Sequence, residues 1–254
     1  MGALHKGHLS LVKQSLDACN HTVVSIFVNP KQFAPNEDFD SYPRDLNIDQ
    51  SALESLGVDV LFLPDETIIY PDNFSTYVEE NMLARGLESL SRPHFFKGVL
   101  TVVLKLFNIV NPQSVFFGKK DYQQFRLIEK MVEDLNLDIN VVGGETIREK
   151  SGLAMSSRNA VFTDNEVQDL GIIYTALKAA KERVELKEKD SSVLKNVIKN
   201  TLAALNGLTV DYIEITDIKN LSSVKIINQS VLISLAVYFK NVRLIDNIEI
   251  IRIK

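Results

Sequence analysis

The feature that most constrains the fold of this chain is the alternation, over residues 1–160, of short β-branched segments with longer amphipathic ones. Strand-like runs occupy residues 22–28, 58–63, 114–117 and 139–142. Helical periodicity occupies residues 45–56, 97–110 and 121–135. Because strands that alternate with helices pair side by side in parallel, this pattern predicts an α/β fold with a Rossmann-like, doubly wound parallel sheet.

The pattern changes after residue 162, where Thr163 precedes Glu166 at the spacing of a helix capping box. Helical periodicity then covers residues 163–186 and 192–205, and strand-like runs cover residues 210–215, 230–239 and 242–245. Two helices followed by strands predict a smaller C-terminal α+β domain. We therefore expect a Rossmann-like domain over residues 1–160 and an α+β domain over residues 161–254.

Charge and composition exclude several classes of protein. The net charge of −5 is opposite in sign to that of a typical nucleic-acid-binding domain, so no nucleic-acid partner is expected. Lys105 interrupts the longest apolar run, residues 99–110, which is too short to span a membrane. The single cysteine, Cys19, cannot form an internal disulfide, and residues 1–8 lack the pattern of a secretory signal. A cytoplasmic protein with no membrane partner is the expectation.

The HKGH motif of residues 5–8 precedes an amphipathic helix that is expected over residues 9–18. A helix N-terminus attracts phosphate through its unpaired amides and its dipole, and Gly7 allows close approach to the backbone. The two histidines, three residues apart, can face one ligand and donate protons to phosphate oxygens. Alone, the motif is also compatible with surface histidines. A zinc site with Cys19 and His21 is disfavoured because their spacing is not that of metal ligands.

Two further segments combine cations with groups that bind phosphate. Residues 118–121, Gly-Lys-Lys-Asp, follow a predicted strand, and ligands of open α/β sheets bind at the carboxyl ends of the strands. Residues 155–159, Met-Ser-Ser-Arg-Asn, supply two hydroxyls and a guanidinium, which can bind phosphate with two parallel hydrogen bonds. Separately, the first segment is compatible with a surface turn and the second with an interdomain linker. Together with the HKGH motif they predict a nucleotide-phosphate site.

Five sequence blocks resemble the signature blocks of the pantothenate synthetase family: MGALHKGHLSLV (1–12), FVNPKQF (27–33), FFGKKDYQQ (116–124), GLAMSSRN (152–159) and RLIDN (243–247). They follow the family's order over nearly the whole chain. HxGH alone indicates only the nucleotidylyltransferase superfamily, which includes class I aminoacyl-tRNA synthetases. FVNPxQF together with GxKDYQQ is selective for the pantothenate synthetases, which are pantoate–β-alanine ligases.

The resemblance implies an AMP-forming ligase of pantothenate biosynthesis, on the route to coenzyme A. ATP would activate pantoate as pantoyl adenylate with release of pyrophosphate, and β-alanine would then displace AMP to give pantothenate. Mg²⁺ would accompany ATP, bound mainly through its phosphates, with no protein ligand assigned. The partners are therefore the small molecules ATP, pantoate and β-alanine, and the resemblance also implies a homodimer.

The resemblance assigns residues to each ligand. The positions that would contact ATP are Met1, Gly2, Ala3, Leu4, His5, Lys6, Gly7, His8, Gly118, Lys119, Lys120, Asp121, Ile147, Met155, Ser156, Ser157 and Arg158. The expected catalytic residues are His5, His8, Lys120 and Arg158. Among them His8 would be the proton donor to phosphate, and Ile147 would contact adenine through its backbone. Gln32 and Gln124 would bind pantoate with Asn29 close by, since an amide both donates and accepts hydrogen bonds.

The chain also departs from the family. Lys119 stands where the family usually has glutamate, and residues 91–99 read SRPHFFKGV where the family has SRPGHFxGV, so no role is assigned to His94. Family members have a strand before MGALH, so we expect the native product to begin upstream of Met1; otherwise the sheet would close up one strand narrower. Two other functions fit these motifs: a nucleotidylyltransferase that makes no amide, and a degenerate relative that binds nucleotide without catalysis.

Overall fold

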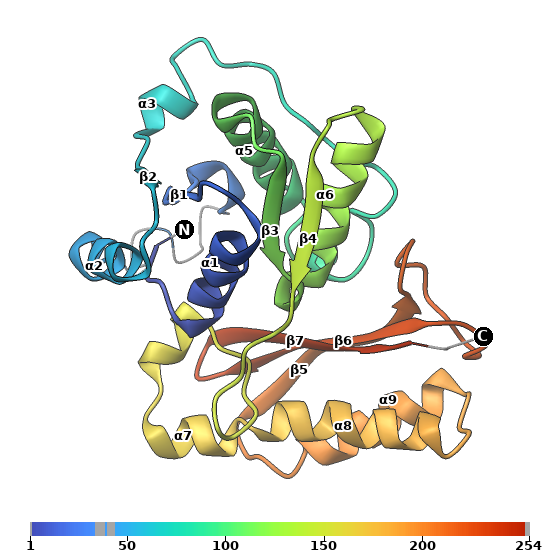
Figure 1. The fold of residues 1–254 in the computed structure, drawn as a ribbon. Helices are drawn as coiled ribbons and strands as arrows, with labels where there is room; N and C mark the ends of the chain where they lie inside the picture. The colour runs from blue at the N-terminus through green and yellow to red at the C-terminus, as the bar shows by residue number, and fades with distance from the viewer. Residues whose placement is uncertain (1, 34–38, 40–43, 252–254) are drawn as a thin grey trace. The chain divides into compact units, whose positions relative to one another are not determined.

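The structure is a computed structural model that describes residues 2–33, 39 and 44–251 (Figure 1). It divides into two compact units. The first unit comprises Met1–Lys119 and Gln123–Glu145, and the second comprises Lys120–Tyr122 and Thr146–Lys254. Met1, predicted to contact ATP, lies outside the described residues.

Parallel strands and helices alternate in the first unit, as the sequence predicts. Its strands are β1 (Val23–Ser25), β2 (Val60–Phe62), β3 (Ser114–Gly118) and β4 (Asn140–Gly144). Its helices are α1 (Lys6–Ala18), α2 (Leu46–Leu56), α3 (Glu66–Ile69), α4 (Glu88–Ser91), α5 (Phe95–Val110) and α6 (Tyr122–Asp134), the first residue of α6 being grouped with the second unit. Short 3₁₀ turns, η1 (Pro30–Gln32) and η2 (Lys119–Asp121), follow β1 and β3.

The strands of the first unit form two parallel pairs, β1 with β2 and β3 with β4. Hydrogen bonds between described residues do not join the pairs into one sheet, so the strands have not closed up with β1 beside β3. Figure 1 shows β3 and β4 side by side, with α5 and α6 next to them. Helix α1 contacts both strands, and Leu11 in the middle of this helix lies next to Gly118 and Gly144 at their carboxyl ends.

Local sequence signals explain where these elements begin and end. Asp45 caps α2 by accepting the amide of Ile48, and Gly57 ends this helix in the left-handed conformation, at a φ of 80°. Strand β2 is shorter than the predicted 58–63, and Pro64, which has no amide to donate to a ladder, follows its carboxyl end closely. The buried helix predicted from the apolar run is α5, which carries the core residues Val99 and Leu100.

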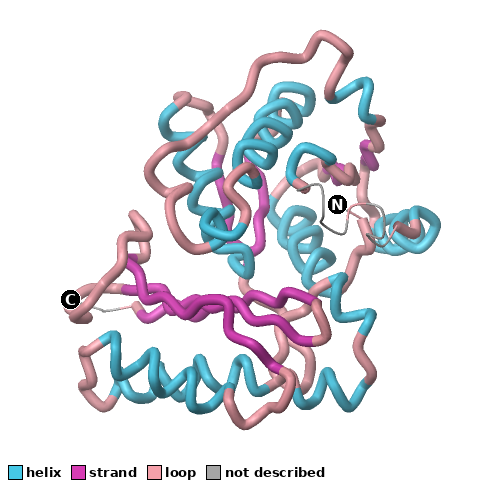
Figure 2. Tube along the Cα trace, turned by 180° about the vertical axis from the view of Figure 1, so that it is seen from behind, coloured by secondary structure: helices cyan, strands magenta, loops and turns pink. Residues whose placement is uncertain are grey.

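The second unit packs helices on one face of an antiparallel sheet. The strands are β5 (Leu208–Asp217), β6 (Val231–Phe239) and β7 (Val242–Ile250), in that order. β5 and β7 extend beyond their predicted runs, and β6 coincides with its predicted run except for the first residue. The other elements are η3 (Ser157–Val161), α7 (Asp164–Asp169), α8 (Ile172–Glu185) and α9 (Ser191–Leu202). Figure 2 shows α8 and α9 along the sheet, where fully buried residues such as Ile198 and Ile233 form the core. The predicted capping box of Thr163 and Glu166 opens α7.

Residues 146–160 belong to the second compact unit. The sequence pattern places the domain boundary at residues 160/161, and this remains a prediction about which segments fold independently. No helix in the described part of the chain has both the length and the apolar character required to cross a bilayer.

Candidate active site

The HKGH motif forms the start of α1. This helix begins at Lys6, three residues before the predicted start, because His5 itself is the N-cap. The His5 Nδ1 atom accepts a hydrogen bond from the amide of Gly7 at 3.1 Å, and the amide of His5 donates to Nδ1 of His8 at 3.3 Å. The two rings lie 4.0 Å apart, with an angle of 31° between their planes. The histidines therefore form a reciprocal capping box.

This capping arrangement determines the tautomer of both neutral imidazoles. An amide can donate only to a ring nitrogen that carries no proton, so Nδ1 is the acceptor in His5 and in His8. The proton of each neutral ring must then be on Nε2. The Nε2–H groups then belong to a helix N-terminus, a place where phosphate is favoured.

A buried carboxylate holds the segment that precedes this helix. Asp49 of α2 is 2% exposed, and its Oδ1 accepts the amide of Leu4 at 2.6 Å. Gly2 has a φ of 89°, and an added Cβ would lie 3.3 Å from Asp49 Oδ2. Sequence reasoning did not identify Asp49, because nothing near it in the chain distinguishes this residue from the other polar residues of the helix.

Asn29 is buried and uses its whole hydrogen-bonding capacity within the protein. Its Oδ1 accepts from the Lys31 amide at 3.2 Å and from the Tyr70 hydroxyl at 2.8 Å. Its Nδ2 donates to the carbonyl of Gly98 at 3.1 Å and to Oε1 of Gln32 at 3.2 Å. Burial raises the pKa of the Tyr70 hydroxyl, and the neighbouring Tyr77 raises it further, so Tyr70 remains a donor at neutral pH.

This network orients the amide of Gln32. The Lys31 amide and the Gly98 carbonyl define which end of Asn29 is oxygen and which is nitrogen. Asn29 therefore donates to Gln32, and Gln32 must turn its Oε1 atom toward Asn29. The Nε2 end of Gln32 is therefore its donor end.

The block at residues 91–99 supports the segment that carries Gln32. The Arg92 guanidinium donates to the carbonyl of Gln32 at 3.1 Å and stacks on the ring of Phe95 at 3.9 Å. Gly98 lies against Lys31, where an added Cβ would be 2.3 Å from the carbonyl oxygen. The block therefore retains a supporting role at Arg92 and Gly98. His94 is the N-cap residue of α5, and its side chain makes no capping hydrogen bond to this helix.

The two adjacent glutamines of α6 differ in their surroundings. Gln123 is 4% exposed, donates to the carbonyls of Leu83 and Gly86 at 2.8 and 3.2 Å, and accepts the amide of Glu88 at 3.1 Å. The side chain of Gln124 has no hydrogen-bond partner among the described residues. Gln123 is thus committed to holding residues 83–88, and Gln124 is the one available to a ligand.

The GKKD segment is shared between the two units. Gly118 ends β3, and Lys119 pairs with Glu145 at 2.7 Å within the first unit. Lys120 and Asp121 belong to the second unit, where Lys120 Nζ lies 3.8 Å from the Asp121 carboxylate. The lysine that replaces the usual glutamate thus has a carboxylate partner of its own.

The MSSR segment follows a hairpin turn in the second unit. The amide of Met155 donates to the carbonyl of Ile147 at 2.9 Å, which pairs the predicted adenine-contacting residue with the start of the segment. Ser156 caps η3 by accepting the amide of Arg158 at 3.3 Å. The structure therefore brings Ile147, residues 155–158 and Lys120 into the same unit.

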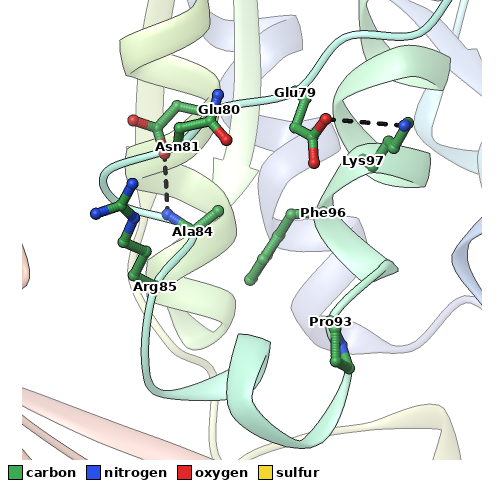
Figure 3. A pocket seen from close by; sticks show the side chains of 8 residues that line it. All are labelled: Glu79, Glu80, Asn81, Ala84, Arg85, Pro93, Phe96 and Lys97. Atoms are coloured by element: carbon green, nitrogen blue, oxygen red, sulfur yellow. Dashed lines mark hydrogen bonds and ion pairs between the residues drawn. The ribbon is translucent and has the colours of Figure 1, made fainter.

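A separate hollow in the first unit is lined by parts of residues 79–85 and 93–97 (Figure 3). Glu79 pairs there with Lys97 at 3.7 Å, and Glu80 accepts the amide of Ala84 at 2.9 Å. None of the predicted site residues lines it. Within the described residues, no three His, Cys, Asp or Glu side chains gather in a way that could hold a metal ion.

Comparison with known proteins decides between the functions that these motifs allow. Residues 1–249 match the family of pantoate-beta-alanine ligases. The chain belongs to the pantoate–β-alanine ligase family. The pantothenate synthetase of Thermosipho africanus is 51% identical over 247 residues, which cover 97% of this chain and 88% of that one. The enzyme of Thermotoga petrophila is 46% identical over the same share of both chains.

Solved structures of ligases in this family have the same fold. The pantothenate synthetase of Thermus thermophilus superposes with a TM-score of 0.95 at 38% identity, covering 99% of this chain and 91% of that one. The pantoate-beta-alanine ligase of Francisella tularensis, in complex with beta-gamma ATP and beta-alanine, gives a TM-score of 0.77 at 39% identity, covering 98% and 86%. The α/β fold and the assignment as an ATP-dependent pantoate–β-alanine ligase are therefore confirmed. A nucleotidylyltransferase outside this ligase family is not supported.

Proposed function

We propose that the chain makes pantothenate in two steps at a site built from the residues described above. A carboxylate oxygen of pantoate attacks the α-phosphorus of ATP, the bond to the bridging oxygen breaks, and pyrophosphate leaves. The amine of β-alanine then attacks the carbonyl carbon of pantoyl adenylate, loses a proton, and expels AMP. The chain needs no nucleophile of its own for either step.

The observation that supports this role best is the pair of Nε2–H donors at the start of α1. Negative charge grows on the phosphate oxygens as pyrophosphate departs. Donors whose orientation is set before the reaction stabilise such charge without further reorganisation. His8 and His5 would hold those oxygens, aided by the amides and dipole of the helix N-terminus.

The pantoate part of the site would be formed by Gln32 and Gln124. Gln32 would donate through Nε2, since Asn29 occupies its oxygen, whereas Gln124 has both amide ends available among the described residues. Pantoate carries two hydroxyls and a carboxylate, so it offers acceptors for both glutamines and donors for Gln124. Asn29 would act by orienting Gln32 rather than by contacting the substrate.

The resemblance to the family also assigns nucleotide contacts to residues of the second unit. Lys120, Ser156, Ser157 and Arg158 would bind phosphate oxygens, and the backbone of Ile147 would contact adenine. Met155 and Asp121 flank these groups. Within the first unit, the resemblance assigns ATP contacts to Gly118 and Lys119 and to Gly2, Ala3, Leu4, Lys6 and Gly7.

Mg²⁺ fits this scheme as an ion carried by ATP. As the resemblance to the family implies, the phosphate oxygens would provide most of its coordination. The ion supplies positive charge to the phosphates when bound. Lys120 and Arg158 would add charge from the protein side.

An assay of AMP formation tests the proposal. We expect AMP only when ATP, pantoate and β-alanine are all present, and exchange of pyrophosphate into ATP when pantoate is present without β-alanine. Release of pyrophosphate without AMP would indicate a different nucleotidylyltransferase. Absence of exchange and of AMP would indicate a relative that binds nucleotide without catalysis.

The resemblance to the family also supports a cytoplasmic homodimer with no nucleic-acid partner. Sedimentation of the purified chain should give a mass close to twice 28.6 kDa. A monomer that retains full activity would contradict the dimer proposal and leave the chemistry unaffected.

A further inference from the structure

The RLIDN block at residues 243–247 has no role in the proposed reaction, yet it contains a buried charge. It lies in β7, where Asp246 and Asn247 are 2% and 7% exposed (Figure 1). Neighbouring residues of a strand point to opposite faces of the sheet. Asp246 lies opposite Leu235 on the face that forms the core, and Asn247 lies opposite Ser234 on the other face.

Asp246 binds the hairpin that leads to the MSSR segment. Arg148 donates to both of its carboxylate oxygens, at 2.6 and 2.9 Å. The same guanidinium donates to the carbonyl of Gly152 at 3.1 Å and stacks on the ring of Tyr174 at 3.7 Å. Arg148 also forms a β-bridge with Ala154, immediately before the segment. Asp246 therefore anchors the backbone that presents residues 155–158.

Asn247 binds the segment that carries the catalytic lysine. Its Nδ2 donates to the carbonyl oxygen of Lys120 at 2.9 Å. Two residues further along β7, Glu249 accepts the hydroxyl of Tyr122 at 3.1 Å. These contacts explain why Lys120–Tyr122 belongs to the second unit while Lys119 and Gln123 belong to the first.

We propose that Asp246 and Asn247 are positioning residues that hold Lys120 and residues 155–158 in one fixed arrangement around the ATP phosphates. Through adjacent positions on one strand, β7 connects two segments that are far apart in the sequence. The inference rests on the proposed function, because it requires Lys120 and Arg158 to act on the same nucleotide.

The free-energy cost of burying the Asp246 carboxylate supports a positioning role for this residue over a purely stabilising one. Burial raises the pKa of the Asp246 carboxyl, and the hydrogen bonds and charge of Arg148 oppose that rise. A buried ion pair gives little net stability compared with apolar residues, but it imposes a specific geometry. The bidentate contact fixes both the position and the plane of the Arg148 guanidinium.

The test is Asn247→Ala, with Ser234→Ala as the matched control. Ser234 faces Asn247 across the strands, is also buried, and its hydroxyl has no hydrogen-bond partner among the described residues. We expect Asn247→Ala to slow single-turnover adenylate formation by about 10- to 100-fold, since small misplacements of a reacting group have effects of this size. The KM for pantoate should stay near the wild-type value. Ser234→Ala should leave both quantities unchanged.

A double variant separates positioning from general loss of structure. If Asn247 acts through Lys120, adding Asn247→Ala to Lys120→Ala should cause little further loss of adenylation rate. If the double variant loses adenylation rate by the product of the two single-variant factors, the inference is overturned. A normal adenylation rate in Asn247→Ala would also overturn it. An unchanged rate in Lys120→Ala would overturn it together with the role of Lys120. AMP formation by the wild type is measured separately. Failure of the proposed function can therefore be distinguished from failure of the positioning role.

Asp246 is tested by a near-isosteric change, Asp246→Asn, which keeps the shape but removes the charge that pairs with Arg148. We expect a weaker apparent affinity for ATP with an unchanged KM for pantoate. If Asp246→Asn lowers the melting temperature, the ATP affinity and the KM for pantoate are measured at a temperature well below thermal unfolding. Equal loss of ATP and pantoate affinity in the folded variant would overturn the assignment of Asp246.

Discussion

The backbone amide of His5 donates a hydrogen bond to Nδ1 of His8 across 3.3 Å, so the second histidine of the motif helps to cap the helix that it belongs to. His8 thus uses Nδ1 for the cap, and Nε2 is the nitrogen that we propose acts on phosphate. The capping contact leaves Nε2 as the only position for the proton of the neutral ring.

Replacing His8 by alanine should slow adenylate formation by about 10²–10³-fold, the effect of removing one donor to a developing charge. Loss of the cap should also lower the free energy of unfolding by about 0.5–2 kcal/mol. Rapid-quench measurement of pyrophosphate release tests the first effect and thermal unfolding tests the second.

The control is His21→Ala, because the His21 side chain is 83% exposed and pairs only with Asp59 among the described residues. Its adenylation rate should equal that of the wild type. Near-normal single-turnover adenylation by His8→Ala would contradict the role assigned to His8.

Replacing Tyr70 by phenylalanine should weaken pantoate binding although Tyr70 is not expected to touch pantoate. The change removes the 2.8 Å hydrogen bond to Asn29 and keeps the ring, which packs edge-on against Phe74. With Asn29 less firmly held, the KM for pantoate should rise about fivefold, equivalent to about 1 kcal/mol. The KM for ATP should not change.

Tyr77→Phe is the matched control, because Tyr77 belongs to the same aromatic group and is 41% exposed. Steady-state kinetics with each substrate varied in turn makes the comparison. A parallel rise in both KM values for Tyr70→Phe would show that the hydroxyl supports the site as a whole instead of orienting Gln32.

The adjacent glutamines of α6 should respond differently to alanine substitution. Gln123→Ala leaves buried backbone groups of residues 83–88 unpaired, so it should lower the free energy of unfolding by about 1–3 kcal/mol. Gln124→Ala should leave stability within about 0.5 kcal/mol of the wild type and raise the KM for pantoate. Thermal unfolding and initial-rate kinetics of both variants would show the difference; a lowered melting temperature for Gln124→Ala would contradict it.

Gly98 should not tolerate alanine, even though alanine favours helices. The added Cβ would lie 2.3 Å from the carbonyl oxygen of Lys31, so α5 and η1 would have to move apart, at a cost of about 1–3 kcal/mol. For stability alone, Gly118→Ala is the control, since the nearest atom to its Cβ belongs to Leu11 at 3.9 Å. Equal melting temperatures of Gly98→Ala and Gly118→Ala would contradict the prediction.

Local signals in the sequence predicted most of the secondary structure correctly. Asp45 and Gly57 delimit α2, and Thr163 with Glu166 opens α7, because caps depend on residues close together in the chain. The start of α1 was predicted too late, since histidine is rarely the N-cap and only the folded geometry shows its ring accepting an amide. Strands β5 and β7 were predicted too short, because cross-strand packing extends pairing beyond the apolar runs.

The sequence by itself determined the alternation of strands and helices and the family, and it predicts that the HKGH, GKKD and MSSR segments bind phosphate. These follow from residue types at fixed local spacings. Only the tertiary structure decided which of two adjacent glutamines is structural, that Tyr70 orients Asn29, and that Arg148 meets Asp246 across 98 positions of sequence. Such contacts depend on side chains that folding brings together from distant segments, and no local pattern specifies the partner of a buried polar group.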